Sequence, residues 1–94
     1  MTPTNYRVVG KFKNETAAPL TLHLEMVPEQ VILEPGDAVE LLARPSDSLL
    51  PLDIAAVENG LHIHPHKVWD PDWHVRFRGQ IIKVSNPTRL SDYR

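Results

Sequence analysis

The amino-acid sequence predicts an all-β protein, folded as a single small antiparallel β-sandwich of seven or eight short strands, with a small barrel as the alternative. Apolar residues recur with a period of two rather than 3.6, which is typical of half-buried strands. Groups of residues that favour turns, such as proline, glycine, asparagine and aspartate, recur at roughly ten-residue spacing. Nine of the 94 residues are proline, close to twice the usual share of about 5%, and most of these prolines fall between the candidate strands.

The first two candidate strands show the alternation directly. In residues 6–12, Tyr6, Val8 and Phe12 share one face, and Gly10 marks a bulge or a close crossing. Residues 20–26 alternate without interruption between two sets of side chains. The inward set is Leu20, Leu22, Leu24 and Met26, and the outward set is Thr21, His23 and Glu25.

Turn residues separate the remaining strands. Pro35-Gly36 fits a type II turn that joins residues 30–33 to residues 38–44, because proline presets φ and glycine supplies a positive φ. Asn59-Gly60 fits the type I′ turn of a hairpin and joins residues 53–57 to residues 61–64. The last two strands, residues 74–78 and 81–84, are separated at Gly79.

The domain is expected to comprise residues 1–84, followed by a polar C-terminal tail of residues 85–94 that lacks periodicity. The alternation predicts a core of Tyr6, Val8, Phe12, Leu20, Leu22, Leu24, Val31, Leu33, Val39, Leu41, Ile54, Leu61, Ile63, Val75, Phe77 and Ile82. A core of this size is marginal, and edge strands of a small sandwich invite pairing between chains. We therefore expect a protein partner or a homo-oligomer such as a homodimer.

Composition excludes several classes of protein. The chain has no cysteine, which excludes a disulfide scaffold, a thiolate zinc site and a cysteine nucleophile. No apolar run approaches the roughly 18 residues of a membrane span, and the N-terminus lacks the apolar segment of a signal peptide. We therefore expect no membrane association and a cytoplasmic location. Nucleotide-binding and hydrolase motifs are absent, so we expect no catalytic residues and no enzyme.

Charge is unevenly distributed along the chain, although the net charge is only −2. Residues 14–58 hold most of the acidic residues and a single base, Arg44, whereas both ends of the chain are basic. This pattern indicates either a bipolar surface that steers a partner or basic and acidic strands that pair across the sheet. A pI near 6.2 and 6% aromatic residues give no support for nucleic-acid binding.

Four of the five histidines lie in residues 62–74. On a strand, His62, His64 and His66 share a face. A two-residue loop at Asn59-Gly60 would place Val57 opposite His62, and Asp53 opposite His66. Imidazoles beside a carboxylate favour a divalent-metal site for zinc, copper or nickel, with Asp53 as a ligand or as a residue that orients one.

Distance limits which histidines can share an ion. His62 and His66 lie about 13 Å apart on a strand at roughly 3.3 Å per residue, too far for one metal with bonds of about 2 Å. Pro65 also interrupts the strand. The feasible pairs are His62 with His64 or His64 with His66, and the third ligand would come from Asp53, His74 or His23. The alternatives are a solvated hairpin face and a pH-dependent interface whose imidazoles charge together in acid.

Two tryptophans flank a turn at Asp70-Pro71-Asp72. Trp69 and Trp73 beside Asp70 and Asp72 could form a platform for a small ligand such as a sugar ring. Alternatively, the tryptophans close one end of the sandwich while the carboxylates make turn hydrogen bonds.

The order of strands and turns in about half of the chain, with an Asn14/Thr16/Pro19 turn and a Pro35-Gly36 turn, is similar to that of small cupredoxin-like sandwiches, and the general shape is cupredoxin- or Ig-like. A blue-copper site requires a cysteine ligand, and this chain has none.

The sequence thus favours a non-catalytic β-domain that acts as a protein-interaction or structural module. A divalent-metal-binding domain is the first alternative, and a small-ligand or carbohydrate-binding module is the second.

Overall fold

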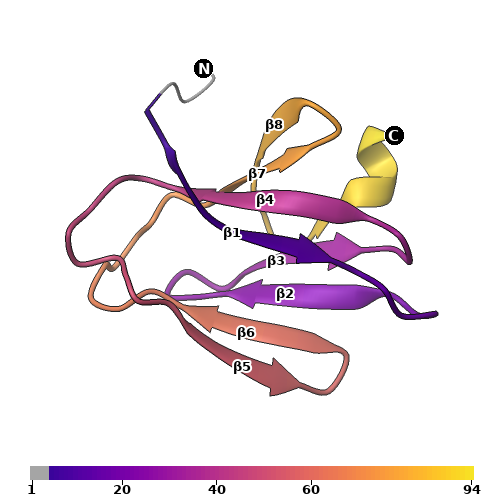
Figure 1. The fold of residues 1–94 in the computed structure, drawn as a ribbon, viewed down its shortest axis with the longest axis horizontal. Coiled ribbons are helices and arrows are strands. Elements are labelled where there is room, and N and C mark those ends of the chain that lie inside the picture. The colour runs from indigo at the N-terminus through magenta and orange to yellow at the C-terminus, as the bar shows by residue number, and fades with distance from the viewer. Residues whose placement is uncertain (1–4) are drawn as a thin grey trace.

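The computed structural model describes residues 5–94, which form two packed β-sheets (Figure 1). The four-stranded sheet has the order β1 (Arg7–Lys13), β4 (Ala38–Ala43), β7 (His74–Phe77), β8 (Gln80–Lys83). The five-stranded sheet has the order β5 (Asp53–Val57), β6 (Gly60–His64), β2 (Leu20–Leu24), β3 (Glu29–Leu33), β9 (Thr88–Arg89). The predicted small all-β sandwich is confirmed, and within the described residues the sheets do not close into a barrel.

Most neighbouring strands are antiparallel, as expected, but two pairs are parallel. β2 pairs in parallel with β6, and β3 pairs in parallel with β9. In the first of these pairs His23 lies beside His62, and Leu24 lies beside Ile63. A parallel pair brings together strands that are distant in the sequence, and this pairing determines which side chains surround the histidines.

The core fills the space between the sheets and contains most of the predicted residues. Fully buried side chains include Leu22, Leu24, Val31, Leu33, Leu41, Ile63, Trp73 and Val75. Two predicted core residues, Val8 and Ile54, are instead exposed at 42% and 50%. A register shift between Val8 and Gly10 reverses the alternation in β1, so Val9 packs against the core instead. Ile54 lies on β5, whose five residues are all exposed.

The residues expected to form a polar tail are part of the sandwich. Thr88–Arg89 forms β9 on the edge of β3, and the 3₁₀ helix η1 (Leu90–Tyr93) places Leu90 in the core with no exposed surface. Arg94 Nη2 donates to Oδ2 of buried Asp37 at 2.9 Å. One apolar residue among polar ones gives no periodicity, so the sequence pattern could not reveal this docking.

The β5–β6 hairpin turns one residue earlier than expected. Its loop residues are Glu58 and Asn59, and Gly60 already belongs to β6. Asn59 has the positive φ of 70°. A Cβ on Gly60 would lie 1.8 Å from the carbonyl oxygen of Thr21, so glycine is required there for the close approach of β2 and not for the type I′ turn.

The earlier turn changes the register of the hairpin by two residues. Ala55 lies opposite His62, and Asp53 lies opposite His64. A shift of two residues preserves the face on which each side chain lies, so the histidines still share the face of Asp53. In the part of the chain that the structure describes, no helix has the length and apolar character needed to cross a membrane.

Candidate metal centre

Two histidines project from the outer face of the five-stranded sheet. They lie on β6, where His62 and His64 alternate with Ile63, which points into the core and has no exposed surface. The burial of Ile63 therefore fixes the outward direction of both imidazoles. The two rings lie side by side, with centroids 5.9 Å apart.

The neighbouring strand β2 supplies a carboxylate. Leu24 is buried at the end of β2, so Glu25, the next residue, projects outward. The Glu25 amide donates to the carbonyl oxygen of Ile63 at 3.0 Å, which continues the parallel register beyond β2 and places Glu25 beside His64. The indole Nε1 of Trp73 donates to the Glu25 carbonyl oxygen at 2.9 Å and fixes this backbone from the core side.

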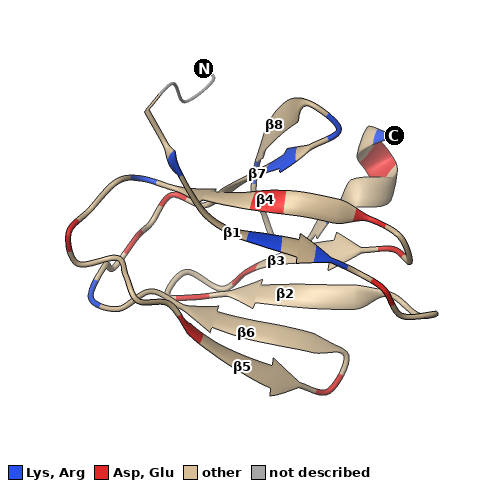
Figure 2. Cartoon of the chain, viewed as in Figure 1, with Lys and Arg blue, Asp and Glu red and all other residues tan. Residues whose placement is uncertain are grey.

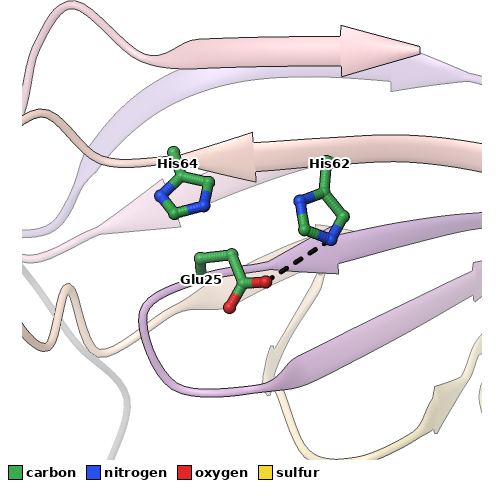
Figure 3. A group of neighbouring side chains, drawn as sticks. All are labelled: Glu25, His62 and His64. Carbon is green, nitrogen blue, oxygen red and sulfur yellow. Dashed lines mark ion pairs between the residues drawn. The ribbon is translucent and has the colours of Figure 1, made fainter. Parts of the chain in front are cut away.

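Glu25, His62 and His64 converge on one point above the sheet (Figure 3). One nitrogen of each imidazole and one carboxylate oxygen all lie within 4.8 Å of one another. His62 Nε2 lies 3.4 Å from Glu25 Oε1, and both side chains are partly exposed. In a tetrahedral site with bonds of about 2.1 Å, ligand atoms lie about 3.4 Å apart. Small rotations of partly exposed side chains would therefore give a coordination geometry.

A hollow of about 110 Å³ adjoins this group and is lined in part by His23, Glu29 and His62. The His23 ring lies 5.4 Å from the His62 ring. Within residues 5–94, the buried Oε1 of Glu29 has no hydrogen-bond partner. Burial raises the pKa of Glu29 above its ordinary value, and the charge of Lys83 opposes this rise. Glu29 lies opposite the buried Leu24, and its Oε2 lies 3.7 Å from Lys83 Nζ on the other sheet. Its carboxylate therefore points away from the outer face on which His62 and His64 lie.

The structure does not bring the other predicted metal ligands into this group. Asp53 lies opposite His64 on β5 but is outside the set of converging ligand atoms. β6 ends at His64, and the exposed His66 follows Pro65 into a loop where its amide donates to Leu49. His74 belongs to the other sheet, where its Nδ1 lies 2.9 Å from the carbonyl oxygen of Asp72.

The two tryptophans do not form a common platform. Trp73 is fully buried in the core, whereas Trp69 is 76% exposed beside a hollow of about 210 Å³. Asp70 accepts a hydrogen bond from the Asp72 amide at 2.9 Å, as expected for a turn. These positions match the interpretation in which a tryptophan closes the sandwich and a carboxylate stabilises the turn.

Asp72 is the centre of an ion-pair network. Lys83 Nζ lies 2.8 Å from one carboxylate oxygen, and Arg44 Nη2 lies 3.4 Å from the other, which also accepts from Tyr6. The hydrogen bond from Lys83, followed by that from Tyr6, lowers the pKa of Asp72 to about 2. The network binds the N-terminal segment to β8 and is a stabilising feature.

Positive charge lies mainly on the four-stranded sheet (Figure 2). Strands β2, β3, β5 and β6 contain no lysine or arginine. Part of the basic charge is paired across the sheet, since Lys11 and Arg76 both contact Glu40 on β4. The titratable side chains of strands β2, β3, β5 and β6 are all carboxylates or imidazoles. This composition favours the binding of a cation.

Comparisons of the chain with protein-family models, with curated proteins and with solved structures gave no significant match. The fold and site therefore define a small β-sandwich with a Glu-His-His cluster on one face. Both histidines were among the metal ligands predicted from the sequence, whereas Glu25 was not. The alternation of residues 20–26 already directed Glu25 outward with His23, and only the partner strand was unknown.

Proposed function

We propose that this domain binds a divalent transition-metal ion, of the class of zinc, copper or nickel, through Glu25, His62 and His64. The observation that carries the proposal is the convergence of two imidazole nitrogens and one carboxylate oxygen within 4.8 Å. Two imidazoles and a carboxylate suit these ions. The ion would join β2 to β6, and its role would be structural or sensory rather than catalytic.

Binding would stabilise the fold. The three ligands lie on two strands that meet only in the folded chain, so the ion favours the native state over the unfolded state. Water in the adjoining hollow or His23 could complete the coordination. Because imidazole binds metal in its neutral form, the affinity for the ion should fall in acid, where protons compete with the metal.

Calorimetric titration and thermal unfolding test this proposal. Zinc, copper and nickel salts are titrated separately into metal-free protein at neutral pH, and we expect heat of binding and a raised Tm with at least one ion. His64→Ala should weaken that ion's binding by at least about tenfold. His66→Ala is the matched control, because His66 lies outside the cluster, and it should leave the affinity unchanged.

Two results would refute metal binding at this site. One is a wild-type protein that shows neither heat nor a change in Tm with any of the three ions. The other is an equal loss of affinity in His66→Ala and His64→Ala, which would place the ion elsewhere.

The non-catalytic protein-interaction role favoured by the sequence is compatible with metal binding. The support for this interaction role is the exposed apolar strand β5, which lies beside β6 but contributes no residue to the Glu25-His62-His64 cluster. The cytoplasmic location expected from the sequence also remains a prediction.

A further inference from the structure

Strand β5 is the most exposed strand of the sandwich. All five of its residues are exposed, although four of them are apolar. Ile54 is 50% exposed and Val57 is 41% exposed, and these residues lie on opposite faces of the strand. β5 is the last strand of its sheet, with β6 on one side and nothing on the other in the described residues (Figure 1).

The other sheet edges formed by residues 5–94 carry features that prevent pairing. β1 has a register shift and carries Lys11 and Lys13. β8 has four residues and ends in Lys83, and β9 has two residues followed directly by η1. β5 has the sequence Asp-Ile-Ala-Ala-Val, without lysine, proline or glycine, and its pairing with β6 shows no bulge. It is an unprotected edge of the kind that pairs with another strand.

The hydrogen-bond pattern shows which backbone groups of β5 are available. The carbonyl oxygen of Ile63 accepts from Glu25 on β2. By alternation, His62 and His64 direct their backbone groups toward β5, where they face Ala55 and Asp53. The N–H and C=O groups of Ile54 and Ala56 therefore point to the open edge.

We infer that β5 pairs antiparallel with β5 of a second copy of this chain, around a two-fold axis at Ala55. In this register Ile54 of each copy lies opposite Ala56 of the other, and the two residues exchange their outward N–H and C=O groups. The two five-stranded sheets then form one continuous sheet across the dimer. The interface is isologous, as in most homodimers.

The sequence of β5 is self-complementary in this register. The two Ala55 residues meet as a non-hydrogen-bonded pair, where strands approach most closely at about 4.5 Å between Cα atoms, and their methyl groups fit this spacing. The large Ile54 lies opposite the small Ala56. Asp53 lies opposite Val57, so the two Asp53 carboxylates are about 13 Å apart at roughly 3.4 Å per residue, and no like charges face each other.

Pairing of β5 with itself names a second copy of the chain as the partner in the proposed protein-interaction role, and so it rests on that role. It does not depend on metal binding. His62 and His64 lie on β6, one strand away from the new interface. Measurements made with a chelator present therefore separate the two proposals: loss of the dimer would leave the metal titrations unaffected.

The molar mass in solution, measured by light scattering with size exclusion in EDTA, tests the inference. The wild-type chain should approach twice its 10.7 kDa mass as its concentration rises. Ala55→Lys places two ammonium groups opposite each other at the axis and should give the mass of one chain. Ala17→Lys, at an exposed loop position, is the matched control and should remain dimeric, with circular dichroism verifying that both variants fold.

A charge-pairing experiment tests the two-fold register itself. Ala55→Glu alone should also be monomeric, because it opposes two carboxylates at the axis. An equimolar mixture of Ala55→Lys and Ala55→Glu should recover the dimer mass, because each pair then unites opposite charges. A monomeric wild-type chain at about 1 mM, a dimeric Ala55→Lys chain, or a mixture that stays monomeric would each overturn the inference.

Discussion

The two edge strands of the five-stranded sheet, β9 and β5, differ in length and in how far they are exposed. At one edge, β9 is short and the chain continues into η1, which buries Leu90 completely and brings Arg94 to Asp37. At the other edge, β5 exposes all five of its residues and nothing in the described chain covers them. We call the first edge closed, because it ends in a two-residue strand followed by a helix that is anchored in the core, and we call the second edge open.

The closed edge therefore serves the stability of the monomer, and the open edge serves association with a partner. The closed edge contributes a buried apolar side chain and an ion pair between partly exposed Arg94 and buried Asp37, which stabilise the monomer. The open edge contributes little burial, but it lies beside the Glu25-His62-His64 cluster and offers unpaired backbone groups. Substitutions at the closed edge should therefore change the free energy of unfolding, whereas those at the open edge should change association.

The largest expected effect comes from removing the apolar anchor of the closed edge. Leu90→Ala should lower the free energy of unfolding by about 2–5 kcal/mol, because it leaves a cavity in the core. Ile54→Ala, at the open edge, should change it by less than about 0.5 kcal/mol in dilute monomeric protein. Urea unfolding of both variants checks the contrast, and equal losses would show that the edges do not differ in this way.

The next prediction concerns the contact between β6 and β2, which joins the β5–β6 hairpin to the rest of the sheet. Gly60→Ala should cost about 1–3 kcal/mol, since its Cβ would meet the Thr21 carbonyl oxygen and separate β2 from β6. Because this pairing positions Glu25 beside the histidines, metal affinity should also fall, by at least about tenfold. Urea unfolding and calorimetry measure the two effects, and native affinity in a destabilised variant would argue against Glu25 as a ligand.

A smaller effect compares the half-buried ion pair of Arg94 and Asp37 with a fully exposed ion pair. Arg94→Ala leaves the Asp37 carboxylate, which is 3% exposed, without its guanidinium partner. We expect a loss of about 1–2 kcal/mol, less than for a fully buried pair because the arginine is partly solvated. Lys13→Ala removes the exposed pair with Glu15 and should cost below about 0.5 kcal/mol. Thermal unfolding of both variants tests this order, and a reversal would weaken the case for a closed C-terminal edge.

The last effect, similar in size to that of Arg94→Ala, concerns the stability of the fold in acid and involves neither edge of the five-stranded sheet. The pKa of Asp72 is about 2 in the fold and 3.8 when unperturbed. Its contribution is therefore present above about pH 4 and is lost as the pH falls toward 2. Asp72→Asn should cost about 1–2 kcal/mol at pH 7 and should reduce the dependence of stability on pH between 4 and 2. An unchanged acid-unfolding profile in Asp72→Asn would show that other carboxylates control it.

The sequence predicted the local features of the fold well. Alternation and turn residues located eight of the strands, and alternation assigned the outward faces of residues 20–25 and 61–64, because side-chain direction in a strand follows from its period of two. Met26, which was expected to face inward, lies beyond β2 and is 41% exposed. The sequence pattern also gave His62 with His64 as one of two feasible ligand pairs, the other being His64 with His66. It failed at Val8, where a bulge reversed the alternation, and at Leu90, which has no periodic neighbours.

The sequence by itself determined the sandwich class, the approximate positions of the turns and the outward direction of the histidines and of Glu25, since these depend on neighbouring residues along the chain. Only the tertiary structure decided that β2 lies in parallel beside β6, which brings Glu25 to His64, and that Leu90 of η1 enters the core while β5 remains open. Pairing between strands distant in sequence depends on how whole sheets pack around the core, and the pattern within one strand does not specify its neighbour.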